Sequence, residues 1–447
     1  MALSGRAAAV AVASVLVVLA VRSLATVLVI DGLLLAGILV DLVLAVPVGA
    51  LRVTREGDTR VRLGEPATVT TVIENTSGRR LRAQLRDAWP PSARASTAQA
   101  STALASTAPA STGQAATGQA SLQLSAGGRG RVAVTVNPAR HGDCISERVT
   151  IRSFGPLGLA ARQRGQRVAW TVRALPPFHS SRHLPGKLAQ LRELDGLHRT
   201  VRPGQGSEFD SLREYVIGDD VRSIDWRSTA RRRDVMVRTW RPERDRRIML
   251  VLDTGRTAAG RVAGYPRLDT AMEAAQLLTA LASKAGDRVD LIAADQRIRA
   301  RVLAPARTAA LAAVTDALAG LQPELAETDW RLVIATILAH ARRRCLVVAL
   351  TDLNPAVDLL PELRALTARH ELLVGSVADP RLAELADGRG DAASVYAAAA
   401  ATRAMAQRSE LAARLGRLGA TVVDAPPERL PAALADAYLA LKASGRL

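Results

Sequence analysis

The chain of 447 residues begins with two apolar runs, at residues 7–21 and 27–48, separated by a short polar break. About 20 apolar residues cross the hydrocarbon core of a bilayer, and about 17 can suffice. The second run is long enough, and so is the first if the residues before it lie at the membrane interface. The pattern therefore predicts two transmembrane helices within residues 1–50. A hairpin that turns at Asp31 and Gly32 instead would move each boundary by several residues.

Charged residues around these runs predict their orientation. Arg6 precedes the first run, and Arg52, Arg55, Arg60 and Arg62 follow the second. Positive charge concentrates on the cytoplasmic side of membrane proteins, so we expect a multi-pass protein of the cell membrane with both termini in the cytoplasm. A cleaved signal peptide is the alternative, because an arginine before an apolar stretch is typical of one. The second run, and the lack of a small-x-small cleavage site, favour the anchor.

Two carboxylates, Asp31 and Asp41, fall inside or near the second run. Carboxylates inside a membrane are costly and often mark proton pathways. Two spans form no bundle that could line such a pathway. Pairing within the hairpin, or a position near the interface, is therefore the favoured interpretation.

Residues 51–177 contain short runs in which apolar and polar residues alternate, bounded by Gly, Pro and Asn. This period-two alternation predicts the strands of an antiparallel β-sandwich. Within the region, residues 95–119 are five near-copies of one pentapeptide (ASTAQ, ASTAL, ASTAP, ASTGQ and AATGQ). The copies have no charge and almost no large apolar group to bury, which predicts a disordered insertion over residues 92–120.

From residue 246 to 447, strand-like apolar runs alternate with helical patterns. The strand candidates are RRIMLVLD, DRVDLIAAD, CLVVALTD, ELLVGSV and ATVVDA. Such alternation predicts an α/β domain with an open, mostly parallel sheet and helices on both faces. Ligands of these sheets bind at the carboxyl ends of the strands, where Asp253 and Asp352 stand. Helical spacing after the first strand is shown by Leu268, Met272, Ala275, Leu278 and Ala282.

Composition limits the chemistry that the chain can support. The formal net charge is +18, but alanine, leucine and arginine are all in excess, so a biased genome accounts for part of it. The two cysteines, Cys144 and Cys345, are far apart, and the six histidines form no HxxxH or HxH pair. These residues provide no disulfide framework and no zinc-site spacing.

One segment, residues 204–240, departs from the alanine-rich texture of the chain. It concentrates carboxylates and arginines, and it holds four of the aromatic residues in a chain with only 5 Trp, 4 Tyr and 3 Phe. A catalytic loop, a nucleic-acid patch and a docking element are the three candidate roles. Its acidic and aromatic residues are Glu208, Phe209, Asp210, Glu214, Tyr215, Asp219, Asp220, Asp225, Trp226 and Trp240.

The order and spacing of this segment resemble the signature of the family known as domain of unknown function 58. That signature runs roughly G-x-E-F-x-x-L-R-x-Y-x-x-G-D-x-x-R-x-I-x-W-x-x-x-A-R. A PLGL turn at residues 156–159 and the tail YLALK near residue 438 also agree with the family. The matching positions are Glu208, Phe209, Leu212, Arg213, Tyr215, Gly218, Asp219, Arg222, Ile224, Trp226, Ala230 and Arg231, with Asp225 between two of them.

The resemblance covers nearly the whole chain and implies a multidomain protein. Its parts would be a transmembrane helical hairpin (1–50), a β-sandwich (51–177), the signature segment with a linker (178–245), and an α/β domain (246–447). The last would be von Willebrand factor type A-like, with a Rossmann-like, mostly parallel sheet. The resemblance also implies a partner, an AAA+ ATPase of the MoxR type, and it implies no enzymatic activity.

Type A domains hold Mg²⁺ through an Asp-x-Ser-x-Ser loop, a distant Thr and a further Asp, because this small cation requires hard oxygen ligands. Two residues of this chain depart from the pattern: Gly255 replaces a hydroxyl ligand, and Arg256 brings positive charge into the loop. A degenerate cleft without metal is favoured, and Mg²⁺ binding is the alternative. The candidate ligands that the resemblance implies are Asp253, Thr257, Thr328 and Asp352.

The expected function is that of a membrane-anchored adaptor or scaffold that binds proteins. Trp, Tyr and Arg concentrate binding energy at interfaces. We expect Arg231, Arg232 and Arg233 to face an acidic partner, and the aromatic residues to fix the segment across the α/β domain near Asp253 and Asp352. In an alternative that stays open, the aromatic residues only anchor the segment, and its arginines pair with its own carboxylates.

Two other classes of function are weaker. Residues 227–247 hold nine arginines against three acids, a plausible footprint for nucleic acid or an anionic membrane surface. No helix-turn-helix, RRM or zinc pattern accompanies them, so nucleic acid is not the favoured partner. The Asp219–Asp220 pair could suggest acid–base catalysis, but GDD is a common turn sequence. The GQG at 204–206 lacks the strand and helix of a nucleotide site, so we expect no enzyme.

Overall fold

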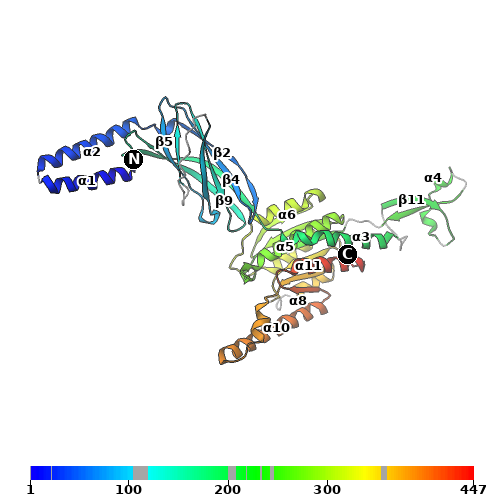
Figure 1. The fold of residues 1–447 in the computed structure, drawn as a ribbon. Helices are drawn as coiled ribbons and strands as arrows, with labels where there is room; N and C mark the ends of the chain where they lie inside the picture. The colour runs from blue at the N-terminus through cyan, green and yellow to red at the C-terminus, as the bar shows by residue number, and fades with distance from the viewer. Residues whose placement is uncertain are drawn as a thin grey trace. The chain divides into compact units, whose positions relative to one another are not determined.

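The chain forms two compact units, residues 1–175 and 176–447 (Figure 1). This is a computed structural model. It describes residues 2–21, 23–103, 119–199, 208–217, 219–231, 234–241, 246–353 and 360–447.

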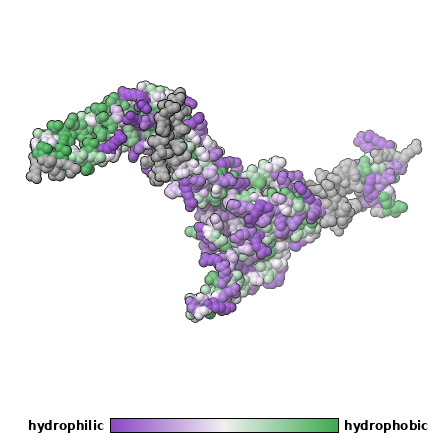
Figure 2. Space-filling model, in the orientation of Figure 1, coloured by the Kyte–Doolittle hydropathy of each residue, from purple (hydrophilic) through white to green (hydrophobic). Residues whose placement is uncertain are grey.

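Two apolar helices open the first unit. They are α1 (Gly5–Val21) and α2 (Leu24–Leu44), and they pack against each other. Figure 2 shows apolar side chains over both helices. Each helix starts earlier than the predicted spans, and α2 ends sooner because the approach to Pro47 requires extended backbone, which begins at Ala45.

One candidate span among the described residues, Ala25–Ala50, which includes most of α2, is long and apolar enough to cross a membrane. It lies near the N-terminus, and a signal sequence there would have the same length and composition. Helix α1 is a shorter apolar helix of 17 residues.

The rest of the first unit consists of two sheets that share an apolar core. Ile73 and Val132 from one sheet pack with Leu85 and Ile151 from the other. Successive side chains of a strand point to opposite faces, so the polar positions between them are left outside, as the period-two alternation predicts. The sheets are β1-β10-β9-β5-β7, with β3 also on β10, and β2-β4-β8-β6. Their strands are β1 (Ala2–Leu3), β2 (Leu51–Gly57), β3 (Arg60–Arg62), β4 (Ala67–Asn75), β5 (Leu81–Asp87), β6 (Ser96–Ala103), β7 (Gln119–Leu124), β8 (Arg129–Val136), β9 (Gly142–Phe154) and β10 (Ala160–Leu175), with short 3₁₀ helices η1 (Val48–Ala50) and η2 (Pro91–Ala93).

Strand β6 corrects the prediction of a disordered insertion over residues 92–120. Its residues belong to the first pentapeptide copies, yet they pair with β8 from Ser96↔Thr135 to Ala103↔Arg129. Strand pairing needs only backbone groups, so small side chains suffice beside an available strand edge. The remaining copies, residues 104–118, lie outside the described residues.

The second unit is built around a six-stranded sheet of order β17-β16-β13-β18-β19-β20. Neighbouring strands are parallel except β17, which runs antiparallel to β16. The strands are β13 (Arg247–Asp253), β16 (Arg288–Ala294), β17 (Ile298–Val302), β18 (Leu346–Leu350), β19 (Glu371–Val377) and β20 (Thr421–Ala425). The helices are α5 (Arg267–Lys284), α6 (Ala310–Ala319), α7 (Trp330–His340), α8 (Leu360–Thr367), α9 (Arg381–Ala386), α10 (Ala392–Arg417) and α11 (Leu430–Ala443). Short elements are η5 (Arg256–Ala259), η6 (Arg307–Ala309), β14 (Arg261–Val262) and β15 (Tyr265–Pro266).

This sheet is buried on both faces. Ile248, Leu250 and Leu252 of β13 belong to a core that also contains α5 and α11, whereas Met249 and Val251 belong to a second core with α7 and α8. A strand with two buried faces reads as a continuous apolar run. The run RRIMLVLD therefore has the structure that the sequence predicted for it.

The predicted boundary at residue 246 is wrong for one helix. The sequence places the residues of η3 (His179–His183) and α3 (Leu184–Arg199) in a linker. Instead, Leu191 is buried in the core with α5, and Leu188 packs against the same core. Apolar residues of α3 thus extend the α/β unit toward its N-terminus.

The segment that resembles the family signature, residues 204–240, is called the resemblance segment here. Its described residues form a small structure of their own. Strands β11 (Glu208–Glu214) and β12 (Met236–Arg241) pair antiparallel, and Ile224 bridges to Val237. Between the strands lie the short helices η4 (Val221–Ser223) and α4 (Trp226–Thr229).

Candidate functional site at the carboxyl edge of the central sheet

Polar side chains gather where β13 and β18 end, and Asp253 is at their centre. Its side chain is buried, so hydrogen bonds must replace the water that its carboxylate loses. Four groups donate to this carboxylate: the backbone N–H of Gly255 at 2.8 Å and the hydroxyls of Thr257 at 3.1 Å, Thr328 at 2.5 Å and Thr351 at 2.6 Å.

Hydrogen bonds thus join three of the four candidate ligands, Asp253, Thr257 and Thr328. The fourth, Asp352, lines the same small cavity as Asp253 and Thr257. Thr328 arrives from the loop before α7, where Asp329 caps the helix by accepting from the N–H of Leu332 at 3.0 Å. The sequence interpretation missed Thr351. Its position one residue before Asp352, at the end of a buried strand, was the available signal.

The fourth candidate, Asp352, is held by two arginines. Arg267, the first residue of α5, donates to one carboxylate oxygen, and Arg408 of α10 donates to the other at 2.6 Å. Arg408 also bonds Asp424 at 2.7 Å and the hydroxyl of Ser376 at 2.7 Å. Burial acts to lower the pKa of Arg408, but the bonds to Asp424 and Asp352 outweigh it, so that pKa is raised.

These residues do not fit a Mg²⁺ site. A divalent cation at Asp352 would stand beside two guanidinium groups, and their charges repel it. The carboxylate of Asp253 is already engaged by four donors. Within the described residues, no group of three or more His, Cys, Asp and Glu is arranged to hold a metal.

Gly255 adds a steric reason. A Cβ at this position would lie 2.3 Å from the Thr328 hydroxyl and 2.8 Å from the carbonyl oxygen of Ala326. A serine, which type A domains use here as a ligand, could enter only if Thr328 moved. Gly255 therefore removes a hydroxyl ligand and also leaves the space in which Thr328 reaches Asp253.

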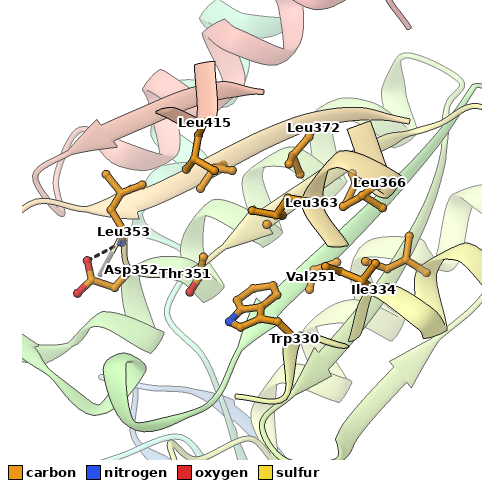
Figure 3. Close-up of a pocket in the computed structure, with 14 residues that line it drawn as sticks. Val251, Trp330, Ile334, Thr351, Asp352, Leu353, Leu363, Leu366, Leu372 and Leu415 are labelled. Atoms are coloured by element: carbon orange, nitrogen blue, oxygen red, sulfur yellow. Dashed lines mark hydrogen bonds between the residues drawn. The ribbon is translucent and has the colours of Figure 1, made fainter. Parts of the chain in front are cut away.

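Three hollows adjoin Asp352, and the smallest, of about 20 Å³, is also lined by Asp253, Thr257 and Arg267. An open cleft of about 480 Å³ is lined by Arg267, Arg408 and Arg414 together with Asp352 and Glu410. Another cavity, of about 40 Å³, is lined almost wholly by apolar side chains, with Asp352 at one side of it (Figure 3). An apolar cavity of this size stays dry, so the open cleft is the one that a polar ligand could enter.

In the resemblance segment, the acidic residues serve its own turns. Asp219 accepts from Arg213 at 2.5 Å and from the N–H of Val216 at 3.0 Å, and these bonds lower its pKa. Asp220 accepts from the N–H of Arg222 at 3.0 Å. The turn-forming interpretation of this Asp pair therefore agrees with the geometry better than acid–base catalysis does.

Asp225 plays the same part for α4. It caps the helix by accepting from the N–H of Ser228 at 2.9 Å, and Arg238 bonds it at 2.7 Å. The helix-cap bond and the Arg238 side chain hold the pKa of Asp225 below its usual range. Internal pairing of arginines and carboxylates, left open by the sequence, is thus observed for Arg213 and Arg238, although Arg222 contributes only its backbone.

The expected burial of Trp226 is wrong in this structure, because its side chain is 69 % exposed. Ile217 is 96 % exposed and Val216 is 61 % exposed in the turn after β11. Tyr215 is half-buried. The segment is held by strand pairing and turn bonds, which leaves these apolar groups on its surface.

Other residues of the segment are only partly described. Phe209 and Glu208 lie in β11, in register with Trp240 and Arg241. Arg231 is exposed just after α4. Gly218, Arg232 and Arg233 lie outside the described residues. Of the arginines in 227–247, Arg238 and Arg247 are ion-paired, the latter with buried Asp290.

A buried thiol and imidazole approach each other at the opposite edge of the sheet. The Cys345 sulfur lies 3.5 Å from Nδ1 of His370, and both side chains are buried. Burial raises the pKa of the thiol to about 11 and lowers that of the imidazole. A thiol that keeps its proton at neutral pH is a poor nucleophile, so the pair lacks the activation that covalent catalysis requires.

Comparisons with known proteins agree with the resemblance over part of the chain. Residues 211–415 match the family described as "Protein of unknown function DUF58". Uncharacterised proteins of Mycobacterium bovis and Mycobacterium tuberculosis are 34 % identical to this chain over 214 residues. That match covers 45 % of this chain and 65 % of each relative. The family region thus begins inside β11 and ends inside α10.

Likeness to solved structures is slight. A FixG-related protein from Vibrio parahaemolyticus covers 28 % of this chain and 96 % of its own, with 10 % identity and a TM-score of 0.17. A GH20 exo β-N-acetylglucosaminidase from Vibrio harveyi covers 84 % of this chain and 75 % of its own, with 12 % identity and a TM-score of 0.20. Scores this low support no inference about fold or function.

Proposed function

We propose that this protein is a membrane-anchored adaptor that binds protein partners and catalyses no reaction. The observation that carries the proposal is the exposure of Ile217 and Trp226 in the same segment as exposed Arg231. Exposed apolar groups that gather into one patch mark interaction sites, and Trp with Arg is typical of binding hot spots. The saturated Asp253 and the ion-paired Asp352 argue against a catalytic role for the sheet edge.

The partner that the resemblance names is an AAA+ ATPase of the MoxR type. An acidic surface on such a partner would suit exposed Arg231 and its neighbours, Arg232 and Arg233, because opposite charges accelerate association. We propose a type A-like role for the α/β unit in which the partner is recognised without Mg²⁺.

The anchor that we propose is a hairpin of α1 and α2, with both ends in the cytoplasm. Two features support it. Strand β1 precedes α1 and pairs with β10 through Ala2↔Ala161 and Leu3↔Ala160, so the start of α1 and the end of α2 meet the same sandwich. Removal of a signal peptide would strip β1 from that sheet. Exposed Arg52 and Arg60 and half-buried Arg62 follow the hairpin, whereas Arg55 is buried with Asp87.

Affinity purification from membranes, with and without ATP, tests the adaptor role. The full chain should retain an AAA+ ATPase, identified by mass spectrometry, in one nucleotide state. Trp226→Ala should weaken that capture at least tenfold, as truncation of a hot spot by about 1.4 kcal/mol or more does. Tyr396→Ala is the matched control, because Tyr396 is an aromatic residue on α10 that is 78 % exposed.

Equal capture by both variants and the unaltered chain would show that the segment is not the docking element. Replacing Arg231, Arg232 and Arg233 with Ser should weaken capture at low salt more than at high salt, since salt screens exposed charges. Retention of DNA instead of protein, with the same salt dependence, would favour the nucleic-acid alternative.

A further inference from the structure

Asp41, near the end of helix α2, connects that helix to the sandwich through hydrogen bonds. It is fully buried, and backbone N–H groups of the turn that links β9 to β10 donate to it. The donors are Leu157 at 2.8 Å, Leu159 at 2.5 Å and Ala160 at 3.1 Å. A carboxylate that receives three backbone hydrogen bonds holds the turn rigidly, since each broken bond would leave a buried polar group unpaired.

Further bonds tie the same places together. Arg162 donates to the carbonyl oxygen of Leu42 at 2.7 Å, and Arg79 donates to that of Val43 at 3.1 Å. At the other helix, the Ser4 hydroxyl donates to the carbonyl oxygen of Gly158 at 2.6 Å. The bases of α1 and α2 are thus fixed to one turn, and the hairpin and sandwich form one body at this point.

The turn has no space for larger residues against the helix. A Cβ at Gly155 would lie 2.3 Å from an Asp41 oxygen, and one at Gly37 would lie 3.0 Å from a methyl carbon of Leu159. The turn therefore lies directly against the last turns of α2.

Resting on the proposed membrane anchor, we propose that the turn Gly155–Leu159 is a lipid-contacting surface at the cytoplasmic face of the membrane. Leu157, 51 % exposed, and Leu3, 70 % exposed, would insert between the acyl chains near the headgroups. Helix α1 has 17 residues. That gives a length of about 25 Å, close to the hydrocarbon thickness of about 30 Å, so its base lies at the boundary and not far outside it.

Charge around the turn matches phospholipid headgroups. Arg6, Arg79 and Arg82 are exposed. Arg82 donates to the carbonyl oxygen of Pro156 at 3.4 Å, and an Arg6 terminal nitrogen would lie 3.2 Å from a Cβ at Gly158, so both stay beside the turn. Arginines next to a membrane helix attract anionic lipids, each by about 1 kcal/mol. The ligand is accordingly the phosphate of an anionic phospholipid within the bilayer.

The test places an environment-sensitive fluorophore on a cysteine at position 157 (Leu157→Cys) in the full chain, in nanodiscs that contain anionic lipid. Ile145→Cys is the matched control, because Ile145 is an apolar residue that is 49 % exposed on β9, the strand that leads into the turn. It lies nine residues from Phe154, or about 30 Å along the strand. Native Cys144 and Cys345 are buried, and both are replaced by alanine in the two variants.

Lipids that carry a spin label near the headgroup should quench the fluorophore at 157 at least threefold more than at 145. Serine at Arg6, an exposed arginine beside the turn, should reduce the quenching at 157 in anionic nanodiscs and leave it unchanged in zwitterionic ones. Added inorganic phosphate should not alter it, because the ligand is held in the bilayer. Phosphate-sensitive quenching would overturn the lipid assignment.

Equal quenching at the two positions would overturn the inference. Carbonate extraction distinguishes that failure from failure of the anchor. A protein that resists carbonate but shows equal quenching is anchored without the lipid contact, whereas a protein that carbonate releases has no membrane anchor at all.

Discussion

Arg408 of α10 donates to Asp352 at 2.6 Å and thereby joins a helix to the carboxylate that follows β18. The Arg408 side chain is only 14 % exposed, and the same guanidinium bonds Asp424. A carboxylate at the carboxyl edge of a parallel sheet is in the position where such folds bind ligands. Here, Arg408 occupies the Asp352 carboxylate, so this ion pair holds α10 against the end of β18.

Removal of this arginine should destabilise the second unit. Arg408→Ala leaves Asp424 without its cation and Asp352 with Arg267 alone, and breaking a buried ion pair costs up to about 3–5 kcal/mol. Hydrogen exchange of the β18 and β19 amides measures the loss in the full chain, because it reports on this unit alone. Arg414→Ala is the control. Arg414 pairs with exposed Glu410 one helical turn away, and such pairs contribute about 0.5 kcal/mol or less. Similar losses of amide protection in both variants would show that the ion pair of Arg408 with Asp352 does not stabilise the unit.

Magnesium should leave the protein unchanged. Ligand at 100 times its dissociation constant stabilises a folded protein by about 2.7 kcal/mol, which is several degrees in melting temperature for a unit of this size. Because Arg267 and Arg408 engage Asp352, we expect no shift on adding Mg²⁺ or EDTA. A rise in melting temperature with Mg²⁺, lost in Asp253→Ala, would show that the cation enters the site after all.

Trp226→Ala should alter stability by about 0.5 kcal/mol or less, since the side chain is mostly exposed and surface substitutions have effects of this size. The burial expected from sequence would instead predict a loss of about 3 kcal/mol or more. Thermal unfolding of the variant distinguishes the two. A large loss would mean that the segment packs against another surface, and the reduced partner capture proposed for this variant would then have a structural cause.

Two deletions test what strand β6 contributes to the sandwich. Removing residues 104–118 shortens a connection, and loop closure changes by only about 0.6 kcal/mol per doubling of length. Removing residues 95–119 also removes β6 and exposes the edge of β8. Each lost strand hydrogen bond costs about 0.5–1.5 kcal/mol. We expect thermal melting to be lowered by the longer deletion alone. Equal melting temperatures would show that β6 contributes nothing.

Cys345 should make stability depend on alkaline pH. Its pKa rises from 9.0 to about 11 on burial, so between these values the folded chain keeps a proton that the unfolded chain loses. The contribution is complete below pH 9 and falls as pH rises toward 11, by about 1.4 kcal/mol per pH unit. Urea unfolding over this range should show a steeper loss in the unaltered chain than in Cys345→Ala. Identical slopes would contradict the burial of the thiol.

The sequence by itself determined the elements whose patterns are long and regular. The apolar runs gave α1 and α2, period-two alternation gave the sandwich strands, and the continuous run at 248–252 gave a strand buried on both faces. Helical spacing gave α5, in which Leu268, Met272 and Leu278 are all buried. These assignments succeed because burial of one or two faces imposes a period that local sequence must follow.

Tertiary structure alone decided what the polar residues do. Arg267, Arg408 and Asp352 lie far apart in the chain, and no local pattern predicts that two guanidinium groups meet one carboxylate. Asp41 looks like a costly charge in an apolar run, yet its three hydrogen bonds come from a turn more than 110 residues away, with separations of 116 to 119 positions. The apolar pattern fixes which face of an element is buried. Hydrogen bonds and ion pairs depend on atomic positions that exist only after the elements have packed.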